Sequence, residues 1–166
     1  MPVKRKVFVS YHHDNDRAYY DSFVKLFAGY YDILSDHSVR QEINSDNADY
    51  VIRRIRELYL TGASTTIVLC GAQTSGRRFV DWEILSSLNQ QMGIVGVNLP
   101  TNLPNANQKY IVPDRLHANI STGYASWLQW AGIVQSPSIL MQAIEASLSA
   151  KRSLIDNSAP KKLRNS

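Results

Sequence analysis

Short runs of β-branched and aromatic residues alternate along the chain with longer stretches whose apolar residues recur every three or four positions. The short runs predict strands at residues 6–11, 31–34, 65–70 and 93–99. The run at 65–70, TTIVLC, has no polar alternation, which is typical of a strand covered on both faces. Strands that alternate with helices imply parallel strands joined by right-handed crossovers. The pattern therefore predicts an α/β fold, a flavodoxin-like three-layer sandwich with a central, mainly parallel sheet.

The helical stretches have recognisable starts. Apolar periodicity predicts helices that begin near residues 16, 48, 77 and 137. The last begins with Ser136 and Pro137, a cap followed by proline in the first turn. Residues 100–116 contain three prolines and are expected to form an irregular connection.

The positive charge of the chain is concentrated at its end. The formal net charge is +4, and five of the 18 Lys and Arg residues but one of the 14 acids lie in residues 151–166. Residues 1–150 are therefore neutral, which argues against a nucleic-acid partner. A chain of 166 residues suits one compact domain, expected at 1–156, followed by a basic and mobile C-terminal tail at 157–166.

Several classes of protein lack their sequence signals here. No secretory leader pattern follows Met1 and no segment approaches about 20 apolar residues, so we expect a cytoplasmic protein without a membrane partner. His12 and His13 lie near acids, but nothing completes a metal-ligand spacing, so no metal is expected. The loop 71–76 lacks the lysine and spacing of a P-loop. Cys70 ends an apolar run and is expected to be a buried thiol.

The stretch RRFVDWEILSS, residues 77–87, places a glutamate beside a tryptophan near the start of a helix. At 100° per residue, Val80 and Ile84 share the core side, whereas Phe79, Trp82 and Glu83 lie off it. The helix dipole alone accounts for an acid at this place. Exposed Phe79 and Trp82, however, call for a ligand, a partner chain or a covering loop.

The carboxyl ends of the predicted strands define where a ligand would bind. In open α/β sheets the ligand crevice lies beyond these ends. The loop 10–16, the region around Asp36, the loop 71–76 and the start of the helix at 77 meet there. Backbone N–H groups at that helix start could hold a phosphate with help from Arg77 or Arg78.

The segments KVFVSYHHDND and SGRRFVDWEI resemble the TIR-like domains of the DUF1863 family, which includes the TIR-like signal-producing proteins of Thoeris anti-phage defence. The resemblance covers about residues 6–99. It implies an enzyme of the NAD glycohydrolase or ADP-ribosyl cyclase type, with NAD as substrate and no further cofactor. Its product would be an ADP-ribose-derived, possibly cyclic, nucleotide that diffuses to an effector protein, and the enzyme would self-associate.

The resemblance also assigns roles to residues. Glu83 matches the catalytic glutamate, and Ser10, Tyr11 and Asp14 match the first-strand loop that helps to form the nucleotide pocket. Aromatic side chains of Tyr11, Phe79 or Trp82 would stack on the nicotinamide or adenine ring. The Pro-Gly loop of adaptor TIR domains is absent from SDHSVRQEINSDN, residues 35–47.

Two alternatives come from other classes. One is a non-catalytic interaction or self-assembly module that uses the exposed aromatic residues. The other is an enzyme similar to nucleoside deoxyribosyltransferases, which place a glutamate on a related α/β sandwich.

Overall fold

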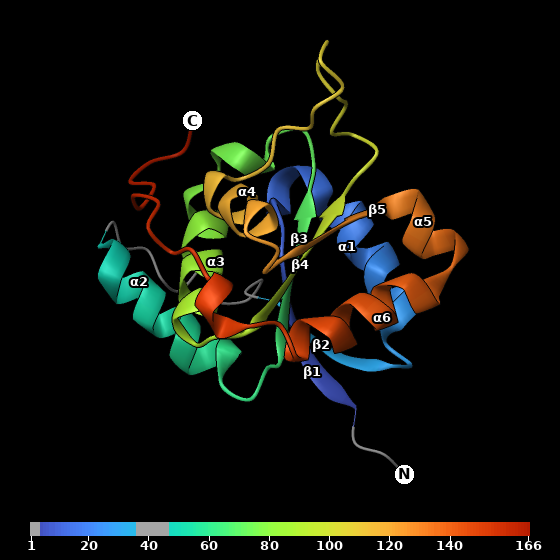
Figure 1. Ribbon diagram of the computed structural model, residues 1–166, viewed down its shortest axis with the longest axis horizontal. Helices are drawn as coiled ribbons and strands as arrows, with labels where there is room; N and C mark the ends of the chain where they lie inside the picture. The colour runs from blue at the N-terminus through green and yellow to red at the C-terminus, as the bar shows by residue number, and fades with distance from the viewer. Residues whose placement is uncertain (1–3, 36–46) are drawn as a thin grey trace.

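A five-stranded parallel sheet forms the centre of the molecule in the computed structural model, which describes residues 4–35 and 47–166 (Figure 1). The strand order is β2-β1-β3-β4-β5, and every pairing between neighbours is parallel. The strands are β1 Arg5–Ser10, β2 Tyr31–Leu34, β3 Thr65–Cys70, β4 Gly93–Asn98 and β5 Ser126–Gln129. This order confirms the predicted flavodoxin-like α/β sandwich.

Helices cover both faces of the sheet and complete three layers (Figure 1). One face carries α1 His13–Phe27, α5 Trp130–Gln135 and α6 Pro137–Leu148. The other carries α2 Ala48–Ile55, α3 Arg78–Asn89 and α4 Asp114–Ser121. A π-helical turn, Arg56–Leu60, extends α2, and 3-10 turns occur at Thr74–Gly76 and Arg152–Leu154.

Strand β1 sends alternate side chains into the two layers. Val7 and Val9 pack with α1 and α6, whereas Phe8 packs with α2 and α3. Ser10, two residues beyond Phe8, therefore faces the α3 layer at the carboxyl end of the strand. This geometry sets which side chains of the first strand can meet α3.

The expected elements all occur, but the sequence did not reveal the last strand of the sheet or the helices on either side of it. Strand β5, with the short sequence SWLQ, and helices α4 and α5 were not predicted. Strand β5 is an edge strand of four residues with no fully buried position, so it lacks the apolar run that marks β3 and β4.

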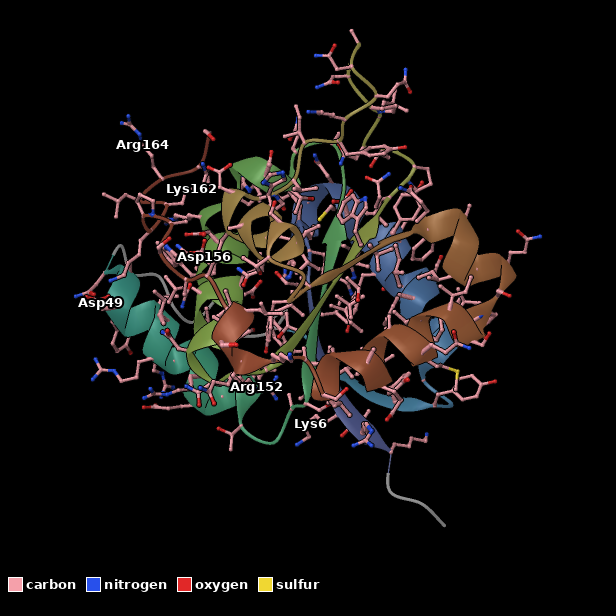
Figure 2. The ribbon with its side chains drawn as sticks, viewed as in Figure 1. Lys6, Asp49, Arg152, Asp156, Lys162 and Arg164 are labelled. Atoms are coloured by element: carbon pink, nitrogen blue, oxygen red, sulfur yellow. The ribbon has the colours of Figure 1, made fainter. Side chains whose placement is uncertain are left out.

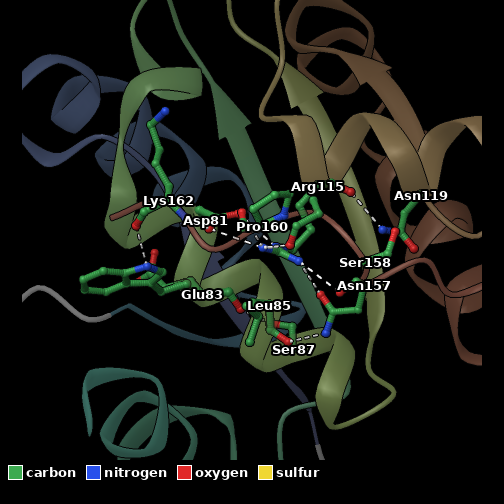
Figure 3. Close-up of polar contacts among 12 residues, drawn as sticks. Asp81, Glu83, Leu85, Ser87, Arg115, Asn119, Asn157, Ser158, Pro160 and Lys162 are labelled. Carbon is green, nitrogen blue, oxygen red and sulfur yellow. Dashed lines mark hydrogen bonds and ion pairs between the residues drawn. The ribbon is translucent and has the colours of Figure 1, made fainter. Parts of the chain in front are cut away.

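The C-terminal segment 156–166 packs along α3, although its composition predicts a mobile tail (Figure 3). Fully buried Arg115 of α4 binds Asp81 of α3, with 2.9 Å between Nε and Oδ1. The same guanidinium donates to Asn157 Oδ1 at 2.8 Å and to the Ala159 carbonyl at 2.9 Å. The guanidinium N–H groups of the buried Arg115 thus hold the tail against the rest of the domain.

Charged side chains anchor the outer edge of this segment. Lys162 and Arg164 lie on the same side of the molecule as Asp49 of α2 (Figure 2), and Lys161 pairs with Asp49. Within the described ranges, no helix is long and apolar enough to cross a membrane.

Candidate functional site

Helix α3 turns Glu83 toward the sheet and away from solvent. The side chain is fully buried, and the Ser10 hydroxyl donates a hydrogen bond to Glu83 Oε1 at 2.7 Å. The helical-wheel prediction, which put Glu83 outside the core, is therefore wrong. Helix α3 packs against the sheet, α2 and α4, and the C-terminal segment covers its remaining side, so residues 80–88 are all buried. A helix covered all round has no polar stripe by which its orientation can be read.

A line of polar contacts connects α3 with the strands below it. Ser87 lies one turn after Glu83, and its hydroxyl donates to the Glu83 carbonyl at 2.7 Å. The Ser87 and Thr66 hydroxyls are 2.6 Å apart, which links α3 to β3. Because buried polar groups are costly unless hydrogen-bonded, this line fixes the rotation of α3 over β1 and β3.

The aromatic residues next to Glu83 are not a free surface. Trp82 is fully buried with Phe8 and Val51 between α3 and α2, and its indole Nε1 donates to the Lys162 carbonyl at 2.9 Å. Phe79 is partly buried, with its ring 5.3 Å from that of Trp82. The expectation that Trp82 is exposed is therefore wrong, because the tail of the chain itself covers it.

The two arginines that precede these aromatics lie at the start of α3. The Arg78 guanidinium stands 5.3 Å from the Trp82 ring and 5.9 Å from the Phe79 ring. The Arg78 backbone N–H donates to Asn165 Oδ1 at 3.0 Å, so a tail amide caps the helix. Arg77 is the N-cap residue and is partly exposed.

The other expected pocket residues are more scattered. Tyr11 is fully buried in the α1 layer, stacked between Tyr20 at 4.5 Å and His13 at 4.3 Å between ring centroids. Asp14 is exposed in the first turn of α1. Asp36 lies outside the described residues.

Two functional candidates escaped the sequence reasoning. Asp16 is almost completely buried, and Thr74 of the loop after β3 donates to its carboxylate at 3.3 Å. Burial raises the pKa of Asp16, although the Thr74 hydrogen bond opposes this shift. Asp16 follows His12 and His13 in the stretch HHDND, and no sequence signal pairs it with Thr74.

Other chemistry finds less support in the structure. Cys70 is buried as expected, and burial together with the charge of Asp16 raises its pKa, so it is a poor nucleophile. Among residues 4–35 and 47–166, no three His, Cys, Asp or Glu side chains gather as a metal site would require.

The fold and the site together define a class of protein. A parallel sheet in the order β2-β1-β3-β4-β5, with a buried glutamate on the helix after the third strand, is a flavodoxin-like domain of the TIR-like kind. The family model described as "Thoeris protein ThsB, TIR-like domain" matches residues 8–103, more than half of the chain. The chain therefore belongs to the TIR-like domain family of the Thoeris protein ThsB. No curated protein matches it.

The matched region contains the elements that build the candidate site. It runs from within β1 to just beyond β4 and includes both Ser10 and Glu83. Helix α4, β5 and the C-terminal segment lie outside it. Membership of this family supports a role in anti-phage defence.

Proposed function

We propose that this protein cleaves the nicotinamide–ribose bond of NAD with Glu83 and releases an ADP-ribose-derived signalling nucleotide, linear or cyclic, during phage infection. The observation that carries the proposal is the buried Glu83 carboxylate, oriented by the Ser10 hydroxyl at the carboxyl end of β1. This place borders the point between β1 and β3 where the strand order reverses, which is where open α/β sheets bind their ligands.

One carboxylate is sufficient for this reaction. Nicotinamide leaves as a neutral molecule from a cationic nitrogen, so the leaving group needs no general acid, in contrast to ordinary glycosides. What must be stabilised is the positive charge that develops on the ribose. A preorganised carboxylate in a site of low dielectric constant provides this stabilisation. The ribose carbon that loses nicotinamide then bonds to water, which releases a proton and gives linear ADP-ribose, or to a nucleophilic atom of the same nucleotide, which gives a cyclic product.

Glu83 has no exposed surface in the present conformation. A substrate can contact its carboxylate only after the groups that cover it move. The site is therefore closed in this conformation, and we propose that binding of the nucleotide itself moves the covering groups.

The neighbouring residues support the binding of a nucleotide to different degrees. Ser10 contacts Glu83 directly and is proposed to orient it. Arg77 and Arg78 at the start of α3 are proposed to contact the diphosphate. Asp14 is exposed at the beginning of α1 and is proposed to line the entrance.

The decisive experiment is nucleotide profiling by mass spectrometry in phage-infected cells. Cells with the wild-type protein should accumulate an ADP-ribose species and free nicotinamide, and Glu83→Gln should reduce both by about 10²–10³-fold because charge stabilisation is lost. The matched control is Glu57→Gln, which neutralises an exposed glutamate. Equal product from Glu83→Gln, with both proteins folded, would remove Glu83 from the reaction.

The alternatives are separated by the same samples. The interaction-module hypothesis relied on exposed aromatics, and burial of Trp82 under the tail takes away part of that support. A deoxyribosyltransferase-like enzyme would release free base from deoxynucleosides and leave NAD intact.

A further inference from the structure

A buried carboxylate joins the two loops that flank the reversal point of the sheet. Helix α1 begins at His13, directly after β1, and its backbone leaves helical geometry at Asp16, with φ −116° and ψ 15°. The Asp16 N–H still donates to the His12 carbonyl at 2.9 Å. The side chain is 1% exposed and contacts the loop that follows β3. An acid on the first-strand loop is thus held by the third-strand loop.

The contacts of this carboxylate form a closed set with Gly71 and Thr74, which we call the Asp16 clamp. The Thr74 hydroxyl donates to Asp16 Oδ2 at 3.3 Å and accepts from the Gly71 N–H at 2.8 Å. A Cβ atom at Gly71 would stand 2.5 Å from both carboxylate oxygens. The carboxylate therefore lies flat against Gly71, and a larger residue at that position would displace it.

A second contact joins the same two segments. The Asn15 side-chain amide donates to Gln73 Oε1 at 2.9 Å on the exposed side of the junction. Asn15 and Asp16 of α1 thus bind Gln73 and Thr74 of the loop. These two hydrogen-bonded pairs set the spacing between the start of α1 and the loop that follows β3.

The clamp is connected to the candidate site by short stretches of chain. Ser10, which binds Glu83, lies six residues before Asp16 on the first segment. On the second, Thr74 lies four residues before the start of α3, the helix that carries Glu83. A change in the spacing between the loops would therefore move Ser10 relative to Glu83.

The choice of an acid at this position carries a cost. Burial disfavours an ionised carboxylate, and the raised pKa of Asp16 reflects that cost. An uncharged side chain at this position would avoid that cost. A costly polar group at a ligand-binding crevice is a common mark of function.

We propose that Asp16 is a positioning residue of the nucleotide crevice, which holds the first-strand and third-strand loops at the separation that an ADP-ribosyl group needs. The inference rests on the proposed function for the identity of the ligand, but the clamp itself stands on the contacts of Asp16, Gly71 and Thr74. It assigns to these residues no direct part in bond cleavage.

The test combines two measurements on folded, purified protein. Isothermal titration calorimetry measures the affinity of the protein for ADP-ribose. Amide hydrogen exchange at residues 71–76 measures, without any ligand, how strongly the clamp holds the loop. Asp16→Asn removes the charge at constant shape, Gly71→Ala pushes on the carboxylate, and Thr74→Val removes the bridging hydroxyl. Thr74→Ser keeps that hydroxyl, and Gly132→Ala is a control at a glycine with open space around its Cβ position.

We expect Asp16→Asn, Gly71→Ala and Thr74→Val each to weaken ADP-ribose binding by roughly tenfold, since small displacements in a binding site are costly. Exchange at the Gly71 amide should accelerate by about tenfold in Thr74→Val, because one hydrogen bond is lost, and return to the wild-type rate in Thr74→Ser. Gly132→Ala should match the wild type in both measurements.

Two outcomes would overturn the inference. Equal affinity of Asp16→Asn and wild type for ADP-ribose would show that Asp16 does not position the crevice. Unchanged exchange at residues 71–76 in all three clamp variants would show that the contacts do not constrain the loop. Failure of the wild type to bind ADP-ribose would instead count against the proposed function, and the exchange measurement would still decide whether the clamp exists.

Discussion

Glu83 and Asp16 illustrate two different uses of a buried acid. The Glu83 carboxylate accepts a hydrogen bond of 2.7 Å from Ser10 and sits on a helix held by further polar contacts. Asp16 sits instead at a break in helical geometry and spans two loops. In the proposed reaction the first arrangement orients the carboxylate, and in our inference the second orients the loops around it.

The stability contributed by Asp16 should depend on pH with a defined sign. Its pKa is raised in the folded protein, so the folded state holds the proton more tightly than the unfolded chain does. The favourable contribution is complete below the unfolded pKa of about 3.9 and is lost as the pH rises through the folded pKa. Asp16→Asn, which does not titrate, should therefore gain stability relative to the wild type as the pH rises from about 4.

Urea unfolding at a series of pH values measures this difference directly. The free energy of unfolding of Asp16→Asn minus that of the wild type should increase across the window and then level off. The curve of Gly132→Ala should run parallel to that of the wild type. A difference for Asp16→Asn that stays constant with pH would mean that the folded and unfolded pKa values of Asp16 are equal.

At the scale of elements, α3 is a helix whose outer side is completed by another part of the chain. Its N-terminal turn receives a cap from Asn165, and its Asp81 accepts from both Arg115 and the Lys162 N–H. Helix α4 and the tail thus hold the helix that carries Glu83 on sides that the sheet does not cover. Loss of one of these partners is expected to loosen α3 as a unit.

Arg115→Met should lower the free energy of unfolding by about 3–5 kcal/mol, because Asp81 would remain buried without its cation. The double variant Arg115→Met, Asp81→Leu should recover part of this loss, since it removes both charges. Arg5→Ala, which breaks the exposed pair with Glu145, should cost less than about 1 kcal/mol. Chemical denaturation measures all three, and a cost for Arg115→Met as small as that for Arg5→Ala would contradict a structural role for the buried pair.

At the scale of the whole molecule, residues 157–166 should behave as part of the folded unit. Deletion of this segment removes the four acceptor atoms that Asn157, Ala159 and Pro160 present to Arg115, the cap on α3 and the cover over Trp82. We expect the melting temperature to fall by about 10 °C, and tryptophan emission to shift to longer wavelength as Trp82 meets water. Lys161→Ala, which removes only an exposed ion pair with Asp49, should change the melting temperature by less than about 3 °C. An unchanged melting temperature after the deletion would show that the segment is dispensable for stability.

The sequence predicted the layers of the molecule better than it predicted their contacts. The apolar runs of β1, β3 and β4 identified the parallel sheet because strands covered on both faces leave a continuous signal. The short edge strand β5 has no continuous apolar run by which it could be recognised in the sequence. The segments shared with TIR-like domains gave the family, which the match over residues 8–103 confirms.

The candidate site was predicted only in part, because its residues meet through contacts far apart in the sequence. Ser10 and Glu83 were both named from the sequence, but their hydrogen bond joins residues 73 positions apart. Burial of Trp82 depends on Lys162, 80 positions away, and its exposure was therefore predicted wrongly. Helical periodicity shows which side of a helix is apolar and which would face water. It cannot show that a segment distant in the sequence packs against the side that would otherwise face water.

The contact between the last residue of the chain and the loop before α3 has a practical consequence for handling the protein. The Ser166 N–H donates to the Gly76 carbonyl at 2.9 Å, and Gly76 has no room for a side chain against Ser166. A bulky label introduced at Gly76 or Ser166 would therefore crowd the start of the helix that carries Glu83. Lys4 is exposed, and strand β1, which follows it, begins at the opposite end of the molecule from the C label (Figure 1), so labels belong on that side.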